Sequence, residues 1–110
     1  MTQDSPIDPQ SFAVTVESTL DDLQNRIEAD VPEVECDLVD SVLTLLLPDD
    51  SQIVLNRQEA VQQIWLACSD GPARFSWQGD AWQDSRTGEP LKQAVGRLLS
   101  LRLGHPVSLG

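Results

Sequence analysis

The chain has 110 residues, enough to bury one hydrophobic core, so we expect a single domain at residues 11–110 behind a flexible tail at residues 1–10. Its 18 acidic and 7 basic residues give a net charge of −11, which argues against nucleic acid or an anionic membrane as a partner. No apolar run is long enough for a membrane span, and the acidic start lacks signal-peptide features. A cytoplasmic location is therefore expected.

The first predicted element is an amphipathic helix that begins at Ser11. Its apolar residues recur every three or four positions, which places them on one buried stripe. The helix is expected to end just before Pro32, because a residue that precedes proline disfavours helical geometry. The stripe consists of Phe12, Val16, Leu20, Leu23 and Ile27.

Five or six strands are predicted next, because the apolar period drops to two. The first strand alternates apolar residues (Val34, Cys36, Leu38) with acids (Glu33, Glu35, Asp37). Further strands are expected at 42–47, 52–56, 60–68 and 74–78, with a short one around Trp82. Turn sequences separate them, including Asp40-Ser41 and the stretch 48–51. The two cysteines, Cys36 and Cys68, are interpreted as small buried residues.

A second helix is expected from about Glu89, with Pro90 in its first turn and Gly104 as its C-cap. Short connections favour antiparallel pairing of consecutive strands. The fold class is therefore α+β: a two-layer α-β sandwich with two helices packed on one face of a five- to six-stranded antiparallel sheet. The other face would be open to solvent and carry Gln52, Val54, Asn56, Gln63, Trp65, Arg74 and Ser76.

Half of the acidic residues are concentrated between Glu17 and Asp40, where Arg26 is the only basic residue. On the helix, Glu17, Asp21 and Glu28 share one side, whereas Asp22 lies on the opposite flank. Such oxygen donors suit hard cations, and without His, Cys or an enclosing loop they predict shallow, unselective sites. A solvated face, a docking surface for a basic partner, and a charged edge that prevents aggregation are alternatives. The candidate metal residues are Glu17, Asp21, Asp22, Glu33, Glu35 and Asp37.

A second candidate surface surrounds Trp65, which alternation places on the open face and therefore in solvent. Trp and Arg dominate the energetics of protein interfaces, so this surface is a candidate partner-binding site. An exposed Trp without a role is the alternative. The candidate partner-binding residues are Asn56, Gln58, Gln63, Trp65 and Arg74.

Several of these stretches together resemble the frataxin family, and its bacterial CyaY-type members most closely. The resemblance covers about residue 11 to the end of the chain. The matching stretches are Val42-Leu43-Thr44-Leu45, Ile53-Val54-Leu55-Asn56-Arg57-Gln58, Gln63-Ile64-Trp65-Leu66-Ala67, Gly71-Pro72-Ala73-Arg74-Phe75-Ser76-Trp77, Trp82 with Asp84-Ser85-Arg86-Thr87-Gly88, and the ending Gly104-His105-Pro106-Val107-Ser108-Leu109.

The resemblance implies the same α-β sandwich and an acidic, iron-binding protein of iron–sulfur cluster assembly. Its cargo would be ferrous or ferric iron, with other divalent cations possible at the same weak sites. Its partners would be a cysteine desulfurase and the cluster scaffold protein, and the chain would be a monomer that iron can drive into oligomers. Glu17, Asp21, Asp22, Glu35 and Asp37 match acidic positions of the family. Ser18 departs from the family pattern, and the stretch 24–32 is longer, so Glu28 and Asp30 have no matched position.

Three functions follow from the sequence. The first is an iron donor or desulfurase regulator without classical catalysis, since no nucleophile–base set is visible. The second is a weak ferroxidase, although the Glu-x-x-His pairs of a di-iron site are absent from the sequence. The third is an acidic interaction module that binds no metal.

Overall fold

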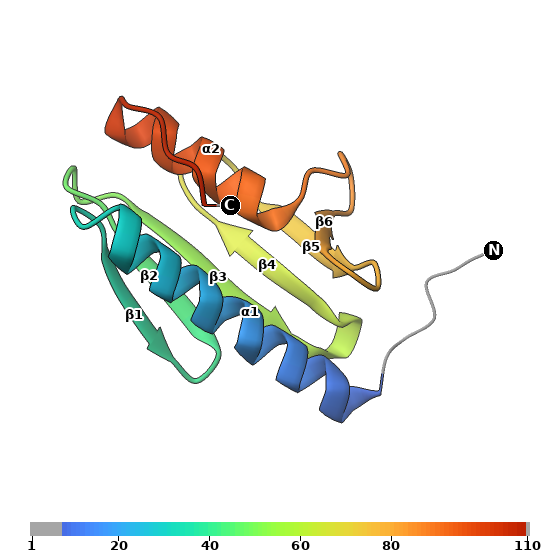
Figure 1. Cartoon of the computed structure of the whole chain (residues 1–110). Helices are drawn as coiled ribbons and strands as arrows, with labels where there is room; N and C mark the ends of the chain where they lie inside the picture. Colours follow the sequence, from blue (N-terminus) through green and yellow to red (C-terminus); the bar gives the residue numbers. More distant parts are fainter. Residues whose placement is uncertain (1–7, 110) are drawn as a thin grey trace.

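Two helices cover one face of a six-stranded antiparallel sheet in the computed structural model, which describes residues 8–109 (Figure 1). The strands lie in the sheet in chain order, and the predicted two-layer α-β sandwich is confirmed. Neither helix is long and apolar enough to cross a membrane, within the part of the chain that the structure describes. The elements are α1 (Pro9–Asp30), β1 (Glu35–Val39), β2 (Val42–Leu46), β3 (Gln52–Gln58), the 3-10 turn η1 (Glu59–Val61), β4 (Gln63–Ala67), β5 (Ala73–Trp77), β6 (Trp82–Asp84) and α2 (Leu91–Leu103).

Helix α1 begins two residues earlier than predicted. The Asp8 carboxylate accepts hydrogen bonds from the backbone N–H groups of Gln10 and Ser11, at 3.1 and 3.2 Å, and Pro9 occupies the first turn, where its missing N–H costs nothing. Pro9 and Gln10 are therefore helical instead of part of a tail. The rest of the predicted tail, residues 1–7, lies outside the described residues. The predicted apolar stripe is confirmed, because all five of its side chains are fully buried.

Three strand boundaries differ from the prediction by two residues or more. Strand β1 begins only at Glu35, so Glu33 lies in the preceding turn and not on the strand face. Strand β3 continues to Gln58, two residues beyond its predicted end. Strand β4 begins at Gln63, because the chain first makes η1 and then passes through Gln62 with a φ of 52°. Alternation in sequence did not reveal this tight turn.

The core lies between the helices and the inner sheet face. Trp82 is 3% exposed, and its indole N–H donates to the Thr19 hydroxyl on α1 at 2.9 Å. Phe12 meets the Trp82 ring edge-on, with ring centroids 6.1 Å apart. This contact joins the β5–β6 hairpin to α1 across the core.

Helix α2 begins at Leu91, with Pro90 as its N-cap instead of a first-turn residue, and ends at the predicted C-cap Gly104, whose φ is 76°. The chain then returns along α2. The Ser100 hydroxyl accepts from the Val107 N–H at 2.8 Å, and Leu109 is 2% exposed. The C-terminal segment is thus packed as part of the helical layer.

Candidate functional site

Helix α1 and strand β1 run antiparallel beside each other and carry most of the clustered acids. The Glu17 carboxylate contacts Ser41, just after the end of β1, whereas Glu28 acts electrostatically on Cys36, near the start of β1. The acids on this side of the molecule therefore follow one edge of the sheet. We call them the acidic edge: Glu17, Asp21, Glu28, Asp30, Glu35, Asp37 and Asp40.

Glu17 differs from its neighbours because it already has partners. It accepts a hydrogen bond from the Ser41 hydroxyl, and its carboxylate lies 3.9 Å from the Arg57 guanidinium. Ser41 has a φ of 64° in the β1–β2 turn, so that turn presents the hydroxyl to α1. Arg57 also lies 3.5 Å from Glu59. A cation that binds Glu17 must therefore compete with a resident positive charge.

Two predicted metal residues lie away from the acidic edge. Asp22 faces α2 and pairs with Lys92 at 2.7 Å. Glu33 lies in the turn before β1 and contacts the His105 ring Nε2 at 2.8 Å. This hydrogen bond lowers the pKa of Glu33 and raises the pKa of His105 from their ordinary values. Of the six candidate metal residues, the fold thus sets apart Asp22, which was already expected on the opposite flank of the helix, and Glu33, which was expected on the strand face beside Glu35 and Asp37.

Asp21, Glu35 and Asp37 remain as exposed predicted ligands without an ion pair among the described residues. No three His, Cys, Asp or Glu side chains in residues 8–109 are grouped so that they could hold one metal ion together. A cation on this edge would therefore meet one or two carboxylates at a time. The chemistry of the donors fits hard cations, and their spacing fits shallow attachment.

The cysteines are free and half-buried, where the sequence predicted burial. Cys36 points between β1 and α1. Burial, with a further contribution from the Glu28 charge, raises the pKa of its thiol to about 11. Its thiolate form is therefore scarce at neutral pH, and the acidic edge gains no sulfur ligand from it.

All five predicted partner-binding residues are brought together on the open face. In the sheet register Asn56 lies opposite Trp65, which lies opposite Arg74. The Arg74 guanidinium carbon lies 4.7 Å from the centroid of the Trp65 ring. The Trp65 indole N–H donates to the Gln63 side chain at 2.7 Å. Gln58 completes the group by donating to Asn56 at 3.0 Å.

These contacts correct one detail of the prediction. Trp65 is half-buried instead of exposed, because Arg74 covers its ring and Gln63 binds its indole N–H. The ring is thus held in one orientation before any partner arrives, which lowers the entropy cost of docking. We call the surface formed by Asn56, Gln58, Gln63, Trp65 and Arg74 the Trp65 face.

The sequence analysis did not predict that three basic residues contact candidate metal ligands from distant parts of the chain. Arg57, Lys92 and His105 each contact a predicted ligand, yet they lie 40, 70 and 72 positions from it along the chain. The only available signal was their scarcity, since the chain has 7 Lys and Arg residues and one His. In a chain this acidic, each of them was a candidate counterion.

Comparison with known proteins identifies the family. A family model described as a frataxin-like domain matches residues 5–105. The chain belongs to the frataxin-like family. Among curated relatives, an iron-sulfur cluster assembly protein CyaY from Thioalkalivibrio sulfidiphilus is 43% identical over 103 residues, which cover 90% of this chain and 96% of the relative. A protein of the same name from Bordetella parapertussis is 34% identical, over 86% of this chain and 84% of the relative.

Solved structures of frataxins have the same fold. A frataxin from Psychromonas ingrahamii superposes with a TM-score of 0.89 at 20% identity, covering 94% of this chain and 99% of that protein. A trimeric frataxin from the yeast Saccharomyces cerevisiae, complexed with ferrous iron, gives 0.66 at 25% identity, covering 93% and 91%. The resemblance to frataxins inferred from the sequence motifs is confirmed.

Proposed function

We propose that this frataxin-like chain acts in iron–sulfur cluster assembly, as a weak iron carrier and as a regulator of the cysteine desulfurase. A role in iron–sulfur cluster assembly is supported by the curated relatives, which are named iron-sulfur cluster assembly proteins. Iron as the cargo, ferrous or ferric, is supported by the yeast frataxin described with ferrous iron and by the oxygen-only donors of the acidic edge. The proposal extends to the cluster scaffold as a second partner.

One observation carries the proposal: the β1 carboxylates of the acidic edge lie on the same side of the sheet as the Trp65 face, with only β2 between them. Glu35 and Asp37 alternate with the inward Cys36, so their side chains lie on the open side of the sheet. Val39, which is 55% exposed, is the β1 member of a row of residues that lie opposite one another across the sheet. The other members are Val42 on β2, Asn56 on β3, Trp65 on β4 and Arg74 on β5. A basic partner could therefore be attracted by the carboxylates and anchored by the ring on a single surface.

Iron would bind at Asp21, Glu35 and Asp37, with Glu17 as a contested ligand. Because each ion would meet few oxygens, we expect weak binding that other divalent cations can compete with. An anaerobic titration with ferrous iron, followed by amide NMR, is expected to shift Asp21, Glu35 and Asp37 first, and Glu17 at higher iron because Arg57 competes there. Asp22 and Glu33 serve as internal controls, because Lys92 and His105 occupy them. Equal shifts at all six candidate carboxylates would contradict the proposal, because they would mean that ion pairing within the fold does not affect which carboxylates bind iron.

Partner binding is tested with Trp65→Ala and purified cysteine desulfurase. Loss of a ring at an interface anchor is expected to weaken binding by about 2 kcal/mol, or about thirtyfold. Leu101→Ala is the matched control, since Leu101 is 64% exposed on the helical layer. If the two variants bind the desulfurase equally well, the Trp65 face is not the anchor.

The proposal assigns no catalytic turnover to the chain. A ferroxidase, the competing function, would consume oxygen with ferrous iron at a rate that falls when Asp21 and Glu35 are both replaced by Ala. A metal-independent interaction module would bind the desulfurase identically with and without iron. We further propose a cytoplasmic monomer that iron can drive into oligomers, which size-exclusion chromatography with and without iron would test.

A further inference from the structure

The strands of the open face carry outward charges of opposite sign on its two sides. On β1 the outward charged side chains are Glu35 and Asp37, and on β5 the outward charged side chain is the exposed Arg74. The strands between them, β2, β3 and β4, contain one charged residue, Arg57, which points to the helical side and contacts α1. A strip of uncharged outward side chains therefore separates the acids from the base (Figure 1).

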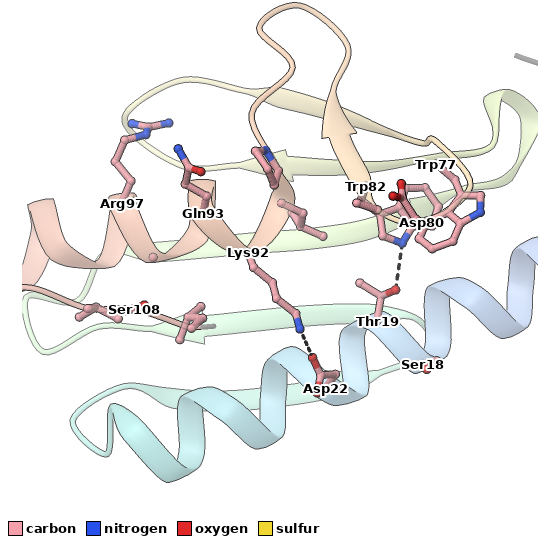
Figure 2. Close-up of a pocket in the computed structure, with 16 residues that line it drawn as sticks. Ser18, Thr19, Asp22, Trp77, Asp80, Trp82, Lys92, Gln93, Arg97 and Ser108 are labelled. Carbon is pink, nitrogen blue, oxygen red and sulfur yellow. Dashed lines mark hydrogen bonds and ion pairs between the residues drawn. The ribbon is translucent and has the colours of Figure 1, made fainter. Parts of the chain in front are cut away.

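Arg74 has no counterion in residues 8–109, although the whole chain has a net charge of −11. By contrast, Lys92 reaches Asp22 at 2.7 Å across the helical layer (Figure 2). Within the same residues, the one contact of the Arg74 guanidinium is with the Trp65 ring, 4.7 Å from its centroid. Such stacking uses the flat face of the guanidinium, whereas its N–H groups lie in the plane. These N–H groups therefore remain available to a carboxylate from outside the chain.

The two charged sides are too far apart for one partner charge to serve both. Four strand spacings separate β1 from β5, which is about 19 Å. The screening length at physiological salt is about 8 Å. Each side of the open face therefore selects its own counterion. A uniformly basic partner surface would fit the acids of β1 but would place a like charge against Arg74.

We propose that the open face binds a protein surface with charges of both signs: basic groups opposite Glu35 and Asp37, and a carboxylate opposite Arg74. This inference rests on the proposed function, in which the Trp65 face docks on the cysteine desulfurase. The partner would cover β2, β3 and β4 with an uncharged surface between its two charged sides. Because a docking pose turned by half a circle would bring like charges together on both sides, the pattern selects one orientation of the partner.

Two variants at one position separate the charge of Arg74 from its contact with the ring. Neither Arg74→Gln nor Arg74→Glu retains the guanidinium over Trp65, so the two differ mainly in one negative charge. Purified desulfurase is titrated with each variant by isothermal calorimetry. Arg74→Glu is expected to bind about tenfold more weakly than Arg74→Gln, because it places a like charge against the partner's carboxylate. A wholly basic partner surface predicts the reverse order. Both variants should fold, since Arg74 is exposed and makes no ion pair in the described residues; equal urea midpoints check this.

Gln93→Glu is the matched control, because it makes the same Gln-to-Glu change on α2, on the other side of the sheet (Figure 2). It should bind within about twofold of the parent. If Trp65→Ala weakens binding but Arg74→Glu binds as well as Arg74→Gln or better, this inference alone is overturned. An equal loss in Gln93→Glu would also overturn it, since net charge would then explain the effect. Unimpaired binding of Trp65→Ala would refute the anchor role of the Trp65 face, and this inference with it.

Discussion

Replacement of Arg57 by Gln should tighten cation binding at Glu17. The Arg57 guanidinium lies 3.9 Å from the Glu17 carboxylate, and a divalent cation bound to that carboxylate would lie about 2 Å from its oxygen. The cation and the guanidinium would therefore be about 6 Å apart. At this separation their repulsion in water is about 1.4 kcal/mol, which is about tenfold in affinity. Screening at about 0.1 M salt reduces the effect to about fourfold.

The assay is an anaerobic titration with ferrous iron, followed at the Glu17 amide by NMR at low and at about 0.1 M salt. Arg86→Gln removes the same charge from the other end of the sheet, because Arg86 follows β6 and the acidic edge borders β1. Three strand spacings, about 14 Å, separate β6 from the β3 residue Arg57 that Glu17 contacts, which exceeds the screening length at about 0.1 M salt, so the control should change affinity little.

Two results would refute the reasoning. Equal tightening by Arg57→Gln and Arg86→Gln would mean that net charge, and not the local counterion, governs binding. Unchanged or weaker binding in Arg57→Gln would mean that iron does not use Glu17. Folding should be nearly unaffected, because the Arg57 and Glu17 side chains are 29% and 48% exposed and such pairs contribute little.

Two further outcomes follow from contacts outside the acidic edge. Trp82→Phe should lower the free energy of unfolding by about 1.5–3 kcal/mol, since it loses the hydrogen bond to Thr19 and leaves a gap; urea unfolding checks this, and a cost no larger than that of Trp77→Phe would contradict it. The Glu33–His105 hydrogen bond stabilises the fold while both groups are charged. Because the pKa of His105 is raised, this stabilisation is lost as the pH rises through the pKa of His105; because the pKa of Glu33 is lowered, it is lost as the pH falls through the pKa of Glu33. His105→Gln should therefore lower the urea midpoint at about pH 5.5 but hardly at about pH 8.5, and an equal loss at both would show that protonation plays no part.

The sequence predicted the layer architecture, the buried stripe of α1 and the side of the sheet that faces solvent. These features are local: a period of 3.6 or of 2 decides which side chains share a face. The same rule brought the Trp65 face together, because residues such as Asn56 and Trp65 alternate outward on neighbouring strands. Boundaries were less well predicted where a single turn intervened, as at η1.

Only the tertiary structure decided which acids remain available to a cation. The sequence places Glu17 and Asp21 on one side of the helix and Asp22 on the opposite flank, but it does not show which of them has a counterion. The fold places Glu17 against Arg57, turns Asp22 toward Lys92 on α2, and leaves Asp21 without an ion pair in the described part of the chain. Ion pairing depends on distances between residues that are remote in sequence, and helical or strand periods contain no information about such distances.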